Sequence, residues 1–140
     1  MTRALDFCLR IADAHARLQR KLDDELGTFH GLSLSDFRLL TALADSDAGL
    51  TASSLSAPLG VQPSAVVRQV LALEKGGWVA REAAGGQRRI LLRGPGRRLQ
   101  HEAVETAGSI CADAMASLPG AEHAQATLEA FSVARALELR

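Results

Sequence analysis

The basic side chains of this 140-residue chain are concentrated in one stretch, and phosphate groups are the partners that such a stretch fits. Residues 60–100 carry a net charge of about +6, whereas residues 1–48 and 101–140 are both net acidic. The basic residues in this stretch are seven arginines and one lysine: Arg68, Lys75, Arg81, Arg88, Arg89, Arg93, Arg97 and Arg98. A local basic footprint on a chain with zero net charge favours a phosphate-backbone partner, although a solvated basic face has the same composition.

Other kinds of chemistry find little support in the sequence. The histidines stand far apart, and the two cysteines, Cys8 and Cys111, lack metal-ligand spacing, so we expect no metal site and no cofactor. The chain has no phosphate loop, nucleophile elbow or paired-carboxylate motif, so we do not expect an enzyme. No apolar run approaches the roughly 20 residues that span a bilayer, and the N-terminus lacks a signal-peptide core. We therefore expect a cytoplasmic protein with no membrane partner.

Helices at both chain ends are predicted to flank the basic stretch. Apolar residues at helical spacing predict a long helix over 3–26 that Gly27 ends, a second long helix over 95–118, and a last helix over 121–138. The first and last of these helices are apolar along one face, and the chain offers little else to cover that face. Pairing of two copies would bury both faces, so we expect a homodimer.

The middle of the chain predicts short helices followed by a hairpin. Ser33 and Asp36 form a capping-box pattern before a helix over 36–45, and Thr51 caps a short third helix. Pro63 suits the first turn of a fourth helix that runs to residue 75. Two strands, at 78–82 and 89–93, then flank a Gly85-Gly86 turn. The fold class is therefore mainly α with a small β-hairpin wing, a winged helix-turn-helix between end helices.

The helix over 63–75 is the predicted recognition element. Val66, Val70, Leu71 and Leu73 are expected to be buried, which leaves the opposite sector for phosphates and base edges in a major groove. The DNA-binding positions expected there are Gln62, Ser64, Ala65, Val67, Arg68 and Gln69. Ser64 has a second interpretation, because its hydroxyl could cap the helix that it begins. Trp78 is expected to pack in the core at the base of the wing.

The hairpin supplies the second predicted contact. The hairpin follows the fourth helix closely in the sequence, so Arg88 and Arg89 could reach an adjacent minor groove. Arg97 and Arg98 follow the hairpin and could approach phosphates or form ion pairs between subunits.

The sequence of the middle third resembles the MarR family (multiple antibiotic resistance regulators). The stretch Leu50-Thr51…Leu55…Leu59-Gly60-Val61 matches the family pattern LTxxxLAxxLGV. The recognition helix and its end, from Pro63-Ser64 to Gly77-Trp78-Val79, match xxSTVTRLVDxLExxGLV, and Gly31-Leu32-Ser33 opens the preceding helix as in GLTxxQxxxLxxL. The long helices at both ends fit the dimerisation part of that family.

The resemblance implies a regulator of transcription. Residues 1–30 and 97–140 would form the dimerisation part, and 31–96 the DNA-binding part, of one 140-residue domain. The expected partners are a second copy of the chain, a pseudo-palindromic double-stranded DNA operator and a small-molecule effector that relieves repression. His15 and His30 could line the effector cleft that family members have, or they could be ordinary surface histidines.

Two features of the sequence keep alternatives open. The family's wing usually ends DxRxxxVxLTxxGR, whereas this chain has neither the Asp nor the Thr and is shorter there, so whether Arg88 or Arg89 acts as the wing arginine is undecided. A degenerate member that binds a protein instead of DNA is therefore one alternative. The other is a thiol-based peroxide sensor that uses Cys8 and Cys111, as similar regulators do, although this chain lacks the tyrosines that assist those cysteines.

Overall fold

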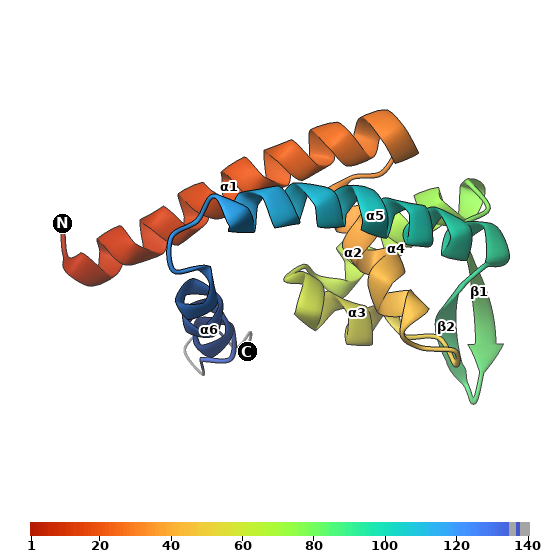
Figure 1. Ribbon diagram of the computed structural model, residues 1–140. Coiled ribbons are helices and arrows are strands. Elements are labelled where there is room, and N and C mark those ends of the chain that lie inside the picture. The colour runs from red at the N-terminus through yellow and green to blue at the C-terminus, as the bar shows by residue number, and fades with distance from the viewer. Residues whose placement is uncertain (135–136, 138–140) are drawn as a thin grey trace. The chain divides into compact units, whose positions relative to one another are not determined.

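The computed structural model describes residues 1–134 and 137, and within them it forms six helices and a two-stranded hairpin (Figure 1). In chain order these are α1 (Arg3–His30), α2 (Leu34–Ala44), α3 (Ala52–Leu59), α4 (Pro63–Lys75), β1 (Val79–Ala84), β2 (Gln87–Leu92), α5 (Gly94–Ala116) and α6 (Ala121–Ser132). The predicted fold class, mainly α with a small hairpin, is confirmed. The chain divides into two compact units between Ala107 and Gly108, within α5.

The first helix runs further than its sequence predicts. The sequence favours Gly27 as its end, whereas α1 continues to His30 and ends at Gly31, whose φ of 67° lies in the left-handed region. The Gly31 amide donates to the carbonyl oxygens of Leu26 and Gly27, which satisfies acceptors that a helix end leaves open. Because a glycine inside a helix costs only about 1 kcal/mol, Gly27 is tolerated there and its prediction as the stop was wrong.

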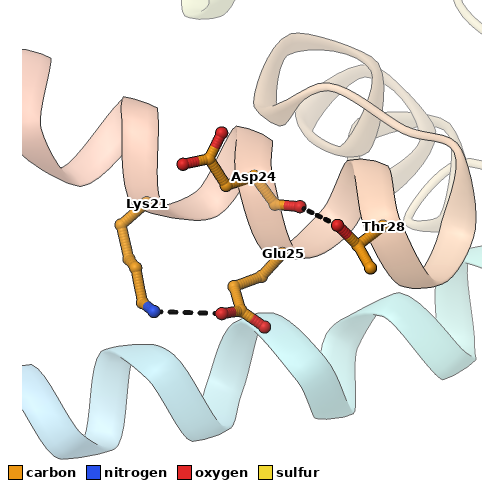
Figure 2. A network of polar contacts seen from close by, with 4 residues as sticks. All are labelled: Lys21, Asp24, Glu25 and Thr28. Atoms are coloured by element: carbon orange, nitrogen blue, oxygen red, sulfur yellow. Dashed lines mark hydrogen bonds and ion pairs between the residues drawn. The ribbon is translucent and has the colours of Figure 1, made fainter.

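Two side-chain interactions lie along the last turns of α1 (Figure 2). The Thr28 hydroxyl donates to the Asp24 carbonyl oxygen at 2.8 Å, and Lys21 pairs with Glu25 one turn along at 3.0 Å. Pairs of charged side chains at this spacing each add a few tenths of a kcal/mol to a helix, roughly 0.2–0.5. The Lys21–Glu25 pair therefore offsets part of the cost of Gly27 inside α1.

The hydrophobic core lies in the first unit, residues 1–107. Its buried apolar residues are Leu22, Leu26, Leu32, Leu39, Leu40, Leu43, Leu55, Val66, Val70, Leu73, Val79, Ile90, Ala103 and Ala107. On α4 the expected inner residues are confirmed except Leu71, which is 38% exposed. That prediction was wrong because Leu71 lies seven residues after Ser64, on the face of α4 that points outward. Trp78 is half-buried at the base of the hairpin.

The hairpin projects from the helices as a short ribbon (Figure 1). Its strands pair antiparallel from Val79↔Leu92 to Ala84↔Gln87, and Gly85 and Gly86 both take a positive φ in the two-residue turn, as predicted. Leu50, between α2 and α3, adds an isolated bridge to Ile90 with two backbone bonds of 3.0 and 2.8 Å. The strand β2 is therefore paired on both sides.

The second unit begins within α5 and includes α6. The sequence predicts these helices over 95–118 and 121–138; α5 ends at Ala116 and α6 at Ser132, and residues 135–136 and 138 lie outside the described part. Over residues 108–134 and 137 no side chain is buried, and several large apolar side chains are exposed: Met115, Leu118, Leu128, Val133 and Leu137. Within the part of the chain that the structure describes, no helix has both the length and the hydrophobicity to cross a membrane.

Candidate nucleic-acid interface

Local signals in the sequence account for the start of α4. Gln62 precedes it in extended conformation with no side-chain capping bond, and Pro63 occupies the first turn, where its missing N–H is not needed. Ser64 is therefore inside the helix and is not its capping residue, so the interpretation of Ser64 as the cap was wrong. Its exposed hydroxyl is left to contact a ligand.

Four exposed residues form one stripe along α4, which we call the recognition stripe: Ser64, Val67, Arg68 and Leu71. They stand at positions i, i+3, i+4 and i+7, the spacing of one helix face. Val67 is 41% exposed, so this stripe combines a hydroxyl and a guanidinium with apolar side chains. Such a set suits a major groove, where guanidinium groups bond guanine and apolar groups contact the thymine methyl. Leu71 was missed by the sequence reasoning, although the same i+7 spacing would have found it.

The remaining predicted positions on α4 differ in exposure. Gln62 is exposed and Ala65 is half-buried. The Gln69 side chain is half-buried and turned toward α2, where its Nε2 donates to Asp36 Oδ1 at 2.8 Å and to Ser35 Oγ at 3.1 Å. The structure therefore groups Gln69 with α2 and not with the recognition stripe.

The two wing arginines have different surroundings. Arg89 is half-buried, and its Nη1 donates to the Gly49 carbonyl oxygen at 3.0 Å, which holds β2 to the loop before α3. Arg88 is exposed near the hairpin tip. A cavity of about 110 Å³ lies between α4 and the hairpin, lined by Ala52, Val67, Val70, Arg81, Arg88 and Ile90. Arg88 and Val67 thus line one space, and Arg88 is the wing arginine that is available to a ligand.

An ion pair ties the recognition helix to the wing. Arg81 on β1 bonds Glu74 in the last turn of α4 through two parallel contacts, Nε to Oε2 and Nη2 to Oε1, each 3.0 Å. These hydrogen bonds hold the pKa of Glu74 below its ordinary value and raise the pKa of Arg81. Two parallel bonds fix orientation as well as distance. The hairpin is thereby oriented against α4.

The Glu74–Arg81 pair makes stability depend on acidity in one direction. Because the folded pKa of Glu74 is lowered, its contribution is present above the ordinary glutamate pKa and is lost as the pH falls through the folded pKa. We expect the unfolding free energy of Glu74→Gln to be lower than that of the wild type at pH 7. Between pH 7 and pH 3 it should fall by less than the unfolding free energy of the wild type does. Denaturant titrations at the two pH values measure this difference, with the exposed Glu105→Gln as the matched control. Equal losses for the wild type and Glu74→Gln would contradict it.

The remaining sequence candidates, two histidines and two cysteines, are on α1 and α5 and not on α4 or the hairpin. His15 is exposed, and His30 is half-buried with its Nε2 2.7 Å from Thr106 Oγ1. Fifteen residues of helix separate the two histidines by about 22 Å, so α1 does not bring them to one point. Cys8 and Cys111 are both exposed and belong to different units. Among the described residues, no group of three or more His, Cys, Asp and Glu is placed to hold a metal ion.

Comparison with known proteins agrees with this geometry. Residues 30–90, which include α2 to α4 and most of the hairpin, match the model of the MarR family. No curated protein sequence matches the chain significantly. A MarR-family transcriptional regulator from Rhodococcus sp. RHA1 has a similar structure, with a TM-score of 0.85 at 19% identity over 95% of this chain and 96% of that one.

Two similar structures from Mycobacterium tuberculosis hold ligands. The regulator MosR, in complex with DNA, has a TM-score of 0.77 at 24% identity over 89% of this chain and 92% of its own. The MarR-family protein Rv2887, in complex with p-aminosalicylic acid, has a TM-score of 0.70 at 26% identity over 88% and 95%. The family match in the helix-turn-helix and the structural likeness over most of the chain agree. Residues 30–90 thus match the MarR family, and the chain has the winged helix-turn-helix fold of MarR-family transcriptional regulators.

Proposed function

We propose that the protein is a homodimeric DNA-binding regulator, a repressor that a small-molecule effector releases from a pseudo-palindromic operator. Residues 31–96 form its DNA-binding part, and residues 1–30 and 97–140 form its dimerisation part. The observation that carries the proposal is the recognition stripe on α4 beside an exposed Arg88 on the wing. MosR, a protein with the same fold, has been seen in complex with DNA.

The helix α4 and the hairpin contribute different contacts to DNA binding. The recognition stripe presents Arg68 for base edges, while Arg88 on the hairpin adds affinity through the backbone or the minor groove. The anchors of the wing, Glu74–Arg81 and Arg89 to Gly49, hold Arg88 at a set place relative to α4 before DNA arrives. Such preorganisation reduces the ordering that binding must impose.

Selection from a random pool of DNA duplexes tests the proposal and requires no assumed operator sequence. The proposal expects enrichment of one sequence with two inverted half-sites about one helical turn apart. A reporter gene placed behind the enriched site should be silenced by the protein. Selection that enriches no sequence would favour the alternative of a family member that binds a protein partner.

Dimerisation is supported by apolar surface that one chain leaves uncovered. On α1 the side chains of Leu5, Leu9 and Leu18 are 49%, 46% and 40% exposed. The second unit lacks a core of its own in residues 108–134 and 137. A two-fold pairing would cover the same faces on both copies.

We expect a dimer at micromolar concentration in sedimentation velocity. Leu5→Glu together with Leu9→Glu should shift the protein toward monomer or unfold it, because the two residues lie one turn apart on one face of α1. Arg3→Glu together with Gln19→Glu, on exposed polar positions of the same helix, is the matched control. A stable folded wild-type monomer would contradict the prediction.

The effector part of the proposal has a direct probe. Rv2887 has been seen with p-aminosalicylic acid, so that compound is the first candidate to titrate against the complex of this protein with its selected duplex. Release of the duplex by this compound or by a related small acid supports effector control. The thiol alternative predicts release by an organic hydroperoxide instead, lost on Cys8→Ser.

A further inference from the structure

The first turn of α2 uses one carboxylate for two different partners. Asp36 Oδ2 accepts from the Ser33 amide at 3.2 Å in the capping box, while Oδ1 accepts from Gln69 Nε2 on α4 at 2.8 Å. The same Gln69 nitrogen lies 3.1 Å from Ser35 Oγ. Because the carboxylate can only accept, the side-chain amide of Gln69 must present its nitrogen to Asp36. Hydrogen bonds to an ionised partner are about twice as strong as neutral ones.

The same turn is also bonded to α1. Asp23 Oδ1 accepts from the Leu34 amide at 2.6 Å, next to the capping box. One turn of α2 therefore holds α1 through Asp23 and α4 through Gln69. The helix α1 belongs to the proposed dimerisation part and α4 to the DNA-binding part. The first turn of α2 therefore fixes the position of α4 relative to α1.

We infer that Gln69 and Asp36 are positioning residues for DNA recognition, and that Gln69 does not itself read a base. A glutamine that reads adenine uses its amide oxygen and nitrogen together, and here the nitrogen already has two acceptors on α2. The bond sets the distance of the middle of α4 from α2, so that the recognition stripe meets the base edges. The inference rests on the proposed function, because positioning of this helix matters only if α4 enters DNA.

A double-mutant cycle on the full-length protein separates positioning from reading. The probe is the duplex that the wild type selects from a random pool, compared with a scrambled duplex, and binding is measured by fluorescence anisotropy well below the unfolding temperature. We expect Gln69→Ala and Asp36→Ala each to lower affinity for the selected duplex on the order of fivefold. The double variant should lose no more than the larger single one, because both remove the same bond.

Two further variants make the cycle specific. Ser33→Ala removes the cap acceptor but leaves the Gln69–Asp36 bond, so it should lower the unfolding temperature and leave DNA affinity within about twofold. Gln69→Lys retains a donor to Asp36 and should restore the ratio of selected to scrambled affinity, with the same preferred base at every position. If Asp36→Ala does not fold, the contrast of Gln69→Ala with Gln69→Lys decides alone.

The outcomes separate the inference from the function on which it rests. Full additivity of Gln69→Ala and Asp36→Ala would overturn the positioning role, as would a change of preference at a single base pair in Gln69→Ala or Gln69→Lys. If the wild type binds a selected duplex and the variants bind it with the same affinity, the inference is wrong and the proposed function is not affected. A wild type that selects no duplex overturns both.

Discussion

Replacement of Arg68 by alanine is expected to weaken binding to the selected duplex by about 1–3 kcal/mol and to flatten the preference among base-pair variants of that duplex. Arg68 is exposed in the middle of the recognition stripe, on a helix that is rigidly packed through Val66 and Val70. A guanidinium in that place can bond a guanine edge through two hydrogen bonds, and alanine leaves that edge without a partner. Titration against the selected duplex and its single-pair variants measures both effects.

Arg88→Ala provides the comparison for Arg68→Ala. Because Arg88 lies on the hairpin and is expected to contact backbone or minor groove, its loss should weaken selected and scrambled duplexes by similar factors. Arg89 is not suited to this comparison, since its bond to the Gly49 carbonyl oxygen holds the wing in place. An Arg68→Ala variant that weakens both duplexes equally would contradict the assignment of base reading to α4.

Gly96→Ala is expected to destabilise the fold by about 3 kcal/mol, the largest effect on stability that we expect from adding a single methyl group. Gly96 is buried in the first turn of α5, and a Cβ there would overlap the carbonyl group of Trp78 and lie 3.0 Å from Leu92 Cδ1. Backbone at the start of β1 cannot yield as a flexible side chain would. The hairpin base and the start of α5 would have to separate, which also moves the wing.

The control for this glycine lies two residues away. A Cβ at Gly94 would meet only Arg98 Nη1 at 3.7 Å, an ordinary contact with a flexible side chain, so Gly94→Ala should change the unfolding free energy by less than about 0.5 kcal/mol. Denaturant unfolding of both variants measures the difference. If Gly96→Ala is as stable as Gly94→Ala, the close packing of α5 on the hairpin base is wrong.

Signals that act within a few residues were predictable from the sequence. The capping box of Ser33 and Asp36, the Thr51 cap and the Gly85-Gly86 turn all appear where the sequence places them. Each depends on backbone groups at most three residues away, so composition and order determine them. The inward face of α4 follows in the same way from its helical period, apart from Leu71.

The parts of the site that the sequence did not predict depend on distant partners. Gln69 bonds Asp36, 33 positions earlier, and Arg89 bonds Gly49, 40 positions earlier. Nothing local to Gln69 or Arg89 distinguishes an anchoring side chain from one that faces a ligand. The prediction that the first helix ends at Gly27 was wrong for a related reason. Either Gly27 or Gly31 could end the helix, and packing of the last turns decides between them.

If α4 and the wing of a dimer bind the DNA backbone and its base edges, the affinity for DNA must fall steeply as the salt concentration rises. The exposed basic side chains of residues 60–100 include Arg68, Arg88 and Arg93. If about four or five basic residues per subunit reach phosphates, a dimer makes on the order of eight to ten contacts, and log affinity falls with log salt by roughly 0.9 per contact. We predict a steep slope for the selected duplex and a shallower slope for Arg88→Ala. A wild-type slope shallower than about −3, unchanged in that variant, would contradict it.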